Sequence, residues 1–201
     1  MKINEHMKVR LLNAGHSAIG YLGALAGLKT IHETVENPVI QQFLQRFLAD
    51  AALTVSAPKG VSIADYQTLL VDQFKNPTLA DQTLRIFKDG AAKIPGFILP
   101  SLLKLLEKGG DKSPHVGSYA MVLACWYRFI AQAIEQGVFL DDSEAQTLAA
   151  LYAVSNGSAK VFYQDQSLFG PLAQYQGYLG LVDAFAKRMK KETALAVVAS
   201  L

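Results

Sequence analysis

Apolar residues recur at intervals of three and four along most of the chain, the spacing that places them on one face of an α-helix. No stretch shows the strict alternation of apolar and polar residues that marks a half-buried β-strand. The pattern therefore predicts an all-α domain of several helices. A first helix is expected over 8–32, apolar almost all round, with small residues that let neighbouring helices approach closely at Ala14, Gly15, Gly20, Gly23 and Gly27.

Capping and turn residues predict where the later helices begin and end. Asn37 and Pro38 should start a helix over 39–50, and Ser62 should cap another over 63–74. A fourth begins near Leu79 and is bent or broken at Gly90 and at Pro95-Gly96. The remaining expectations are helices over 100–107 and 116–136, one capped by Asp141 or Asp142 that runs through Val154, and two short helices towards Leu201.

Length and charge limit the class of protein. A chain of 201 residues fits one domain with a real hydrophobic core, and 51% of its residues are hydrophobic. The formal net charge is +2 without any long block of like charges, so nothing indicates nucleic acid as a partner. The uncharged segment 11–28 is long enough to raise the question of a membrane span. Its polar residues Asn13, His16 and Ser17 and its glycines favour a buried core helix instead.

The single cysteine, Cys125, lies in an apolar run, so it has no partner for an internal disulfide and is expected to be a buried, inert thiol. The first eight residues lack the apolar core of a secretion signal. Both observations favour a reducing, cytoplasmic compartment.

Several common site motifs are missing from the sequence. It has no Gly-x-Gly-x-x-Gly, no phosphate-binding loop and no Cys-x-x-Cys or His-x-x-x-His pair for zinc. We therefore expect neither a metal site nor dinucleotide binding by this chain alone. The adjacent His32 and Glu33 invite a metal interpretation, but neighbouring helix residues point about 100° apart, which favours capping or packing roles.

Three polar residues on the first predicted helix form the strongest candidate site. At about 100° per residue, Lys8, Asn13 and His16 project within an arc of about 140°. A partly buried lysine can take the proton of an alcohol, an amide can hold the developing oxyanion, and an imidazole can bind a hydroxyl. Taken singly, each residue also has an ordinary interpretation: a solvated lysine at a helix start, a capping asparagine and a core histidine.

The pattern Lys-x-x-x-x-Asn-x-x-His formed by these three residues resembles the signature of the polyol-specific long-chain dehydrogenases, the mannitol dehydrogenase family. The surrounding residues are similar in the same order. They are Leu11-Leu12-Asn13-Ala14-Gly15-His16-Ser17, Tyr21-Leu22-Gly23, Ile31-His32-Glu33-Thr34, Phe74-Lys75-Asn76-Pro77, Ala80-Asp81-Gln82, Arg85-Ile86, Asp89-Gly90, Lys93-Ile94-Pro95 and Leu168-Phe169-Gly170.

The resemblance implies that 1–201 is the helical C-terminal domain of such an enzyme, that 1–7 is the remnant of a linker, and that the Rossmann domain is absent. Lys8 would be the general acid/base, Asn13 part of an oxyanion hole, and His16 a substrate ligand, without a metal. Arg85 and Lys93 resemble family positions that line the substrate site. NAD or NADP would be bound mainly by the missing N-terminal domain.

The reaction so implied is hydride transfer between NAD(P) and a secondary alcohol of a hexitol or hexonate, with mannitol and fructose as the first choice. The alternatives are a fructuronate or tagaturonate reductase, an arabinitol enzyme, and a non-catalytic helical fragment that serves as an interaction module.

Overall fold

The computed structural model describes residues 5–79 and 88–201, and within these ranges its elements are helices joined by loops, without a β-strand. The all-α prediction is therefore confirmed. The N-terminal rod consists of α1 (Glu5–Met7), the π-helix η1 (Lys8–Asn13) and α2 (Ala14–Leu25) in direct succession. None of the described helices is both long enough and apolar enough to span a bilayer, and α2 is largely buried.

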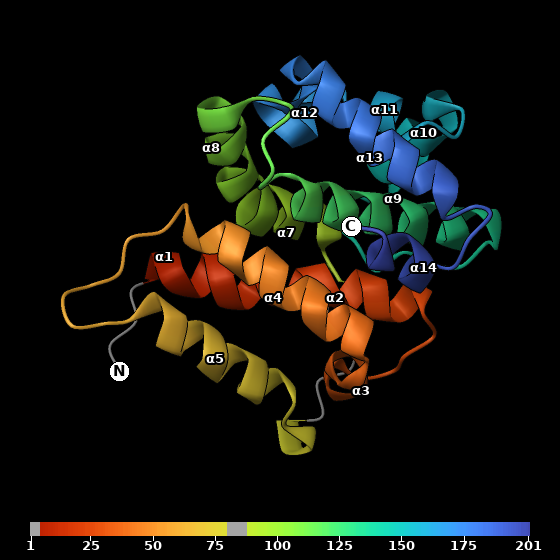
Figure 1. Cartoon of the computed structure of the whole chain (residues 1–201). Helices are drawn as coiled ribbons and strands as arrows, with labels where there is room; N and C mark the ends of the chain where they lie inside the picture. The colour runs from red at the N-terminus through yellow and green to blue at the C-terminus, as the bar shows by residue number, and fades with distance from the viewer. Residues whose placement is uncertain (1–4, 80–87) are drawn as a thin grey trace.

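The long helix α9 (Gly117–Glu135) lies at the centre of the fold, between α2 and α13 (Gln176–Arg188) (Figure 1). Helix α4 (Pro38–Ala52) crosses α2 and α9, and α5 (Ile63–Phe74) covers the outer side of α4. The remaining elements are α3 (Ile31–Glu36), η2 (Pro77–Leu79), α7 (Gly90–Lys93), η3 (Ile94–Ile98), α8 (Leu99–Gly109), α10 (Ala145–Ser155), α11 (Ala159–Phe162), α12 (Gln166–Phe169), η4 (Gly170–Gln174) and α14 (Ala194–Ala199).

An aromatic cluster fills the space between α9 and the C-terminal helices. The rings of Trp126, Phe162, Tyr163 and Phe169 lie with centroids 4.8–6.1 Å apart, and each residue is at most 1% exposed. The hydroxyl of Tyr163 donates to the carbonyl of Leu123 at 2.7 Å, so its polar end is satisfied. Burial of these rings is the main packing force that holds the C-terminal half against α9.

Cys125 is buried in the same helix, and burial raises the pKa of its thiol to about 12. Because the thiolate is the reactive form, this cysteine is chemically inert at neutral pH.

Two predicted helix starts are confirmed in detail. The side-chain oxygen of Asn37 accepts from the N–H groups of Val39 and Ile40, and Pro38 follows as the first helical residue of α4. The hydroxyl of Ser62 accepts from the N–H of Asp65 at the start of α5. These bonds satisfy N–H groups that have no partner within the helix.

The predicted first helix over 8–32 is wrong at both ends. Helical structure begins at Glu5, and α2 ends at Leu25 because Gly27 adopts φ 76° in a Schellman motif closed by a Leu28 N–H bond to the Gly23 carbonyl. A separate helix, α3, then begins at the capping box of Thr30 and Glu33. Glu33 therefore has the capping role that was expected of it.

Two expectations for the C-terminal half also need correction. Neither Asp141 nor Asp142 is the N-cap of α10, which begins at Ala145, because a carboxylate oxygen of Asp142 is taken by the N–H of Ala91 from a distant part of the chain. The region after α10 contains four helices and the 3-10 helix η4 rather than two short helices.

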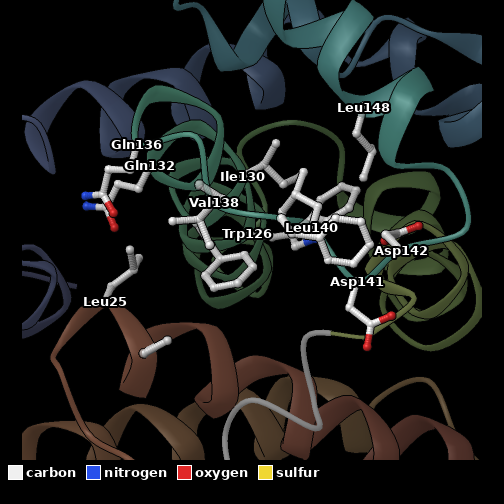
Figure 2. A pocket seen from close by; sticks show the side chains of 14 residues that line it. Leu25, Trp126, Ile130, Gln132, Gln136, Val138, Leu140, Asp141, Asp142 and Leu148 are labelled. Carbon is white, nitrogen blue, oxygen red and sulfur yellow. The ribbon is translucent and has the colours of Figure 1, made fainter.

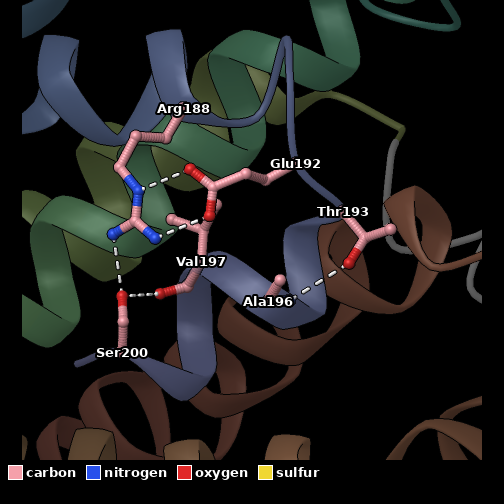
Figure 3. A network of polar contacts seen from close by, with 6 residues as sticks. All are labelled: Arg188, Glu192, Thr193, Ala196, Val197 and Ser200. Carbon is pink, nitrogen blue, oxygen red and sulfur yellow. Dashed lines mark hydrogen bonds and ion pairs between the residues drawn. The ribbon is translucent and has the colours of Figure 1, made fainter.

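The last helix is fastened to α13 by polar contacts near the chain end. Figure 3 shows Arg188, at the end of α13, in a bidentate ion pair with Glu192. The third guanidinium nitrogen of Arg188 donates to the hydroxyl of Ser200. Thr193 caps α14 by accepting from the N–H of Ala196. Helix α14 packs back against α4.

Candidate active site

The three candidate residues lie on the N-terminal rod, and its π-helical turn alters their spacing. In η1 the backbone hydrogen bonds join residues five apart, as shown by the N–H of Ala14, which donates to the carbonyl of Val9. A wider turn leaves less angular offset between residues five apart than the roughly 140° of an α-helix. Lys8 and Asn13 are the first and last residues of η1, so the π turn brings them towards the same side of the rod.

The face that carries these residues is partly open. Lys8 is exposed, whereas Asn13 and His16 are half-buried. The ring of His16 meets the edge of Phe74 from α5 with centroids 4.4 Å apart. The carbonyl of Asn13 accepts from the hydroxyl of Ser17 at 3.1 Å. The amide side chain of Asn13 makes no capping bond to α2, so the capping alternative does not hold for this residue.

Arg10 anchors the opposite side of η1 to the core, a contact that the sequence analysis did not identify. Its side chain is 8% exposed, and one guanidinium nitrogen donates to the hydroxyl of Ser101 on α8 at 3.3 Å. Ser101 is in turn 2.8 Å from the hydroxyl of Thr54. Burial lowers the pKa of the Arg10 guanidinium, which nonetheless stays protonated at neutral pH. Arg10 thus anchors the buried side of the π turn to α8, while Lys8 lies on its exposed side.

Lys93 precedes a segment that contacts the N-terminal rod from a distant part of the sequence. It is the last residue of α7, and the π-helix η3 that follows packs against both η1 and α2. Lys93 is half-buried, and burial lowers its pKa, with Lys88 lowering it further and the carboxylates of Asp89 and Asp142 opposing the change. The fifth predicted residue, Arg85, lies outside the described residues.

The second π turn has an evident local cause. Pro95 lacks the N–H that a regular α-helix would direct to an earlier carbonyl, and Gly96 has little preference for the α conformation. The N–H of Leu99 instead donates to the carbonyl of Ile94, five residues back. The two π turns, η1 and η3, therefore contact one another beside the candidate residues. In other proteins π turns are frequently found at functional sites.

A cavity of about 360 Å³ lies between α2, α9 and the loop that follows α9 (Figure 2). Its wall is mostly apolar, with carboxylates at one end. The residues that define it include Leu25, Trp126, Ile130, Leu140, Asp141 and Asp142. The loop from 138 to 142 is thus shared between this cavity and the base of α7.

No group of three or more potential metal ligands occurs in the described part of the chain. The ring of His32 is used in packing instead: its Nδ1 donates to the carbonyl of Lys75 at 2.6 Å, and its Nε2 lies 3.4 Å from Glu36.

Comparison with known proteins gives the family. Residues 2–191 match the family of mannitol dehydrogenase C-terminal domains. The chain belongs to this family. A mannitol 2-dehydrogenase from Phaeosphaeria nodorum is 37% identical over 84% of the chain, and a D-arabinitol 4-dehydrogenase from Ralstonia nicotianae is 30% identical over 92% of it. The chain spans 29% and 40%, respectively, of the length of these two relatives.

A solved structure with the same fold is the mannitol 2-dehydrogenase of Pseudomonas fluorescens, in a ternary complex with NAD and D-mannitol. It superposes with a TM-score of 0.87 at 25% identity and covers 98% of this chain, which in turn covers 40% of that protein. The resemblance inferred from Lys8, Asn13 and His16 is therefore confirmed for the family and for the fold.

Proposed function

We propose that this chain is the substrate-binding and catalytic part of an NAD-dependent polyol dehydrogenase, in which Lys8 is the general acid/base. The observation that carries the proposal is the arrangement of Lys8, Asn13 and His16 on one partly open face, opposite the segment that bears Lys93. In the mannitol dehydrogenase family, the resemblance assigns catalysis and substrate binding to these positions.

Lys8 moves the proton. When a secondary alcohol is oxidised, its hydroxyl proton must leave as the hydride departs from the same carbon, and the amine of Lys8 takes that proton. In the reverse direction the ammonium returns it to the ketone oxygen. We assign the amide of Asn13 to the same oxygen: its N–H donates to the negative charge that develops there. The π turn that Lys8 and Asn13 bound supports this assignment, since it lessens the angle between them around the rod.

His16 and Lys93 bind the rest of the substrate. The imidazole of His16 has its ring packed against Phe74, which fixes its orientation for a hydrogen bond to a neighbouring hydroxyl. Lys93 adds a cation, which suits either a hydroxyl or a carboxylate. We place Arg85 in the same group on the basis of the family resemblance alone.

The nicotinamide cofactor supplies the hydride acceptor, and we propose that a Rossmann domain preceding this helical domain, 1–201, holds it. The described residues of this chain contain no strand followed by a glycine-rich turn, so they do not fit a dinucleotide. NAD is bound by the Pseudomonas fluorescens relative. That complex supports NAD over NADP for this chain as well.

Mannitol, with fructose as its oxidation product, is the substrate we favour. The mannitol and arabinitol dehydrogenases among the relatives support a polyol over a sugar acid. A fructuronate or tagaturonate reductase, and a non-catalytic interaction module, are accordingly not favoured.

The test is to join this chain to the nucleotide-binding domain of a mannitol dehydrogenase and to measure NAD-dependent oxidation of mannitol, arabinitol and mannonate. We expect turnover with mannitol above the other two. The chain alone should show neither turnover nor calorimetrically detectable NADH binding. Tight, stoichiometric NADH binding by the chain alone would contradict this division of labour, and a fusion that binds NADH without oxidising any polyol would contradict the proposed activity.

A further inference from the structure

The turn that leads into α7 is hydrogen-bonded to the loop that follows α9, some fifty residues away in the sequence. The N–H of Asp89 donates to the carbonyl of Asp141 at 3.0 Å, and the N–H of Ala91 donates to a carboxylate oxygen of Asp142 at 2.9 Å. In the opposite direction, the N–H of Ser143 donates to a carboxylate oxygen of Asp89 at 3.3 Å. We refer to these three bonds as the 89–143 clamp.

The clamp holds an unusual backbone conformation. Asp89 has φ 54° and ψ 43°, the left-handed region that a side chain with a Cβ rarely enters, although aspartate tolerates it better than most residues. Both oxygens of Asp142 are engaged, since the second accepts from the N–H of Glu144 at 2.9 Å. A strained residue persists only where surrounding contacts determine its conformation, and here the clamp supplies those contacts.

Lys93 is one helical turn from this strained residue. Its N–H donates to the carbonyl of Asp89 at 3.0 Å, so the place of Lys93 follows directly from the conformation at position 89. The two clamp carboxylates also act on the Lys93 ammonium electrostatically, since both oppose the lowering of its pKa by burial. Backbone geometry and charge at Lys93 therefore depend on the same two aspartates.

We infer that Asp89 and Asp142 are positioning residues for Lys93: through the clamp they fix the start of α7 against the loop that follows α9, and with it the place of Lys93 and of η3, which contacts η1, so that the ammonium meets the substrate. This inference rests on the proposed role of Lys93 in substrate binding. Neither aspartate touches the proton-transferring group, so they act on the affinity for the polyol rather than on the chemical step.

The experiment uses the fusion of this chain to a nucleotide-binding domain. Asp142→Ala removes an acceptor for the N–H of Ala91, and we expect KM for the polyol to rise roughly tenfold with kcat changed less than twofold, as for the loss of one hydrogen bond. Asp142→Asn keeps an oxygen acceptor and should recover part of that loss. Asp89→Asn, which also tolerates the left-handed conformation, separates the charge of this position from its geometry.

Asp141→Asn is the matched control. It removes a neighbouring negative charge and a 3.8 Å ion pair with Lys88 but leaves all three clamp bonds intact, because Asp141 contributes only its carbonyl. We expect an unchanged KM. A KM increase in Asp141→Asn equal to that of Asp142→Ala would overturn the inference, because it would show a general charge effect.

Lys93→Met distinguishes this inference from the proposed function. If Lys93→Met raises KM and Asp142→Ala does not, the clamp inference is wrong while the role of Lys93 stands. If Lys93→Met leaves KM unchanged, the role of Lys93 is wrong. The NMR titration of the Lys93 ammonium in this chain then still decides whether the clamp acts on it: its pKa should fall in Asp142→Asn and Asp89→Asn but not in Asp141→Asn. Unchanged titration in all three variants would contradict the clamp.

Discussion

The face formed by η1 and the α7–η3 segment and the aromatic cluster around Trp126 lie on neighbouring elements, but they are held in place by different forces. The cluster is packed from regular helices and is at most 1% exposed at each ring. The face is built on two π turns and on the strained Asp89, and its residues are half-buried or exposed.

The difference shows how a helical domain can combine a stable core with a site of defined geometry. Close packing tolerates only side chains of the right volume, whereas irregular turns can direct polar groups that packing alone would not place. In this chain the two meet at Gly90, where an added Cβ would lie 2.5 Å from the indole nitrogen of Trp126 and 2.7 Å from the hydroxyl of Tyr21. The base of α7 thus rests directly on the cluster.

The largest effect is expected from Lys8→Ala in the fused enzyme, which alters the face and leaves the aromatic cluster intact. A positioned general base contributes a factor of about 10²–10⁴, so kcat should fall by that factor while NADH affinity and the unfolding temperature stay unchanged. A primary amine added to the assay should restore part of the rate. Steady-state kinetics with and without the amine measures this.

Lys59→Ala, which removes an exposed lysine from the turn before α5, is the control and should leave kcat unaltered. Near-normal kcat with only a raised KM in Lys8→Ala would make Lys8 a binding residue.

Phe162→Ala alters the aromatic cluster and leaves the face intact. Phe162 is 1% exposed, and its ring packs against four other aromatic rings. We expect the free energy of unfolding, from urea titration of this chain, to fall by about 3–5 kcal/mol because a large cavity is left. The neighbouring Val161→Ala, at an exposed position, should change it by less than about 0.5 kcal/mol. A similar loss in both variants would show that α11 rather than the ring is responsible.

Gly90→Ala tests the junction between the two regions. Because the new Cβ would overlap the indole of Trp126, we expect a loss of about 1–3 kcal/mol in the free energy of unfolding, with a raised KM in the fused enzyme. Gly96→Ala is the matched control, because no atom lies within 4 Å of its added Cβ. It should leave the free energy of unfolding unchanged or raise it slightly. Equal behaviour of the two variants would rule out steric contact as the cause.

The smallest effect concerns the polar edge of the cluster at Asp183. Burial raises the pKa of Asp183, but hydrogen bonds from Lys187, from Ser158 and from the N–H of Lys160 outweigh it, so the pKa lies below its ordinary value. A carboxyl group whose pKa is lowered by folding stabilises the folded state at pH values above its unfolded pKa of about 3.9. This contribution is lost as the pH falls through the folded-state pKa. Asp183→Asn should cost about 1 kcal/mol at pH 7 and less at pH 2, because protonation of Asp183 removes the charge-dependent part of its contribution.

Urea titrations at the two pH values test this prediction. Glu192→Gln is a useful comparison because its ion pair with Arg188 is exposed, so we expect little change at either pH. A pH-independent cost of Asp183→Asn would assign the effect to packing instead of charge.

The sequence predicted the longer helices and only part of the face. Helices α4, α5 and α9 follow from apolar periodicity with caps at Asn37 and Ser62, because each cap bonds to residues two or three positions away. The break after Leu25 had local signals as well, namely Gly27 and the Thr30 capping box, but the glycine was interpreted as a small packing residue.

The first π turn, the clamp and the anchor of Arg10 lacked such signals, whereas the second π turn falls at Pro95-Gly96, where a bend or break was expected. Asp142 is paired with Ala91, and Arg10 with Ser101, across 51 and 91 residues, so only the folded chain reveals them. The candidate residues themselves were found through the spacing of Lys8, Asn13 and His16. The approach of Lys93 depends on the packing of η3 against η1, which periodicity does not encode.

The π turn at Lys8–Asn13 bears on how the site responds to a change in chain length. A π turn holds one more residue than an α turn in about the same rotation and rise, so deletion of a single residue within this stretch would allow a regular α-helix to form. The parts of the rod on either side of the deletion would then stay close to their present positions. Lys8 and Asn13 would be four residues apart in that α-helix, about 40° from each other around the rod. Loss of one residue between them would therefore keep both on the same side, whereas the same deletion in a regular α-helix would turn everything before it by about 100°.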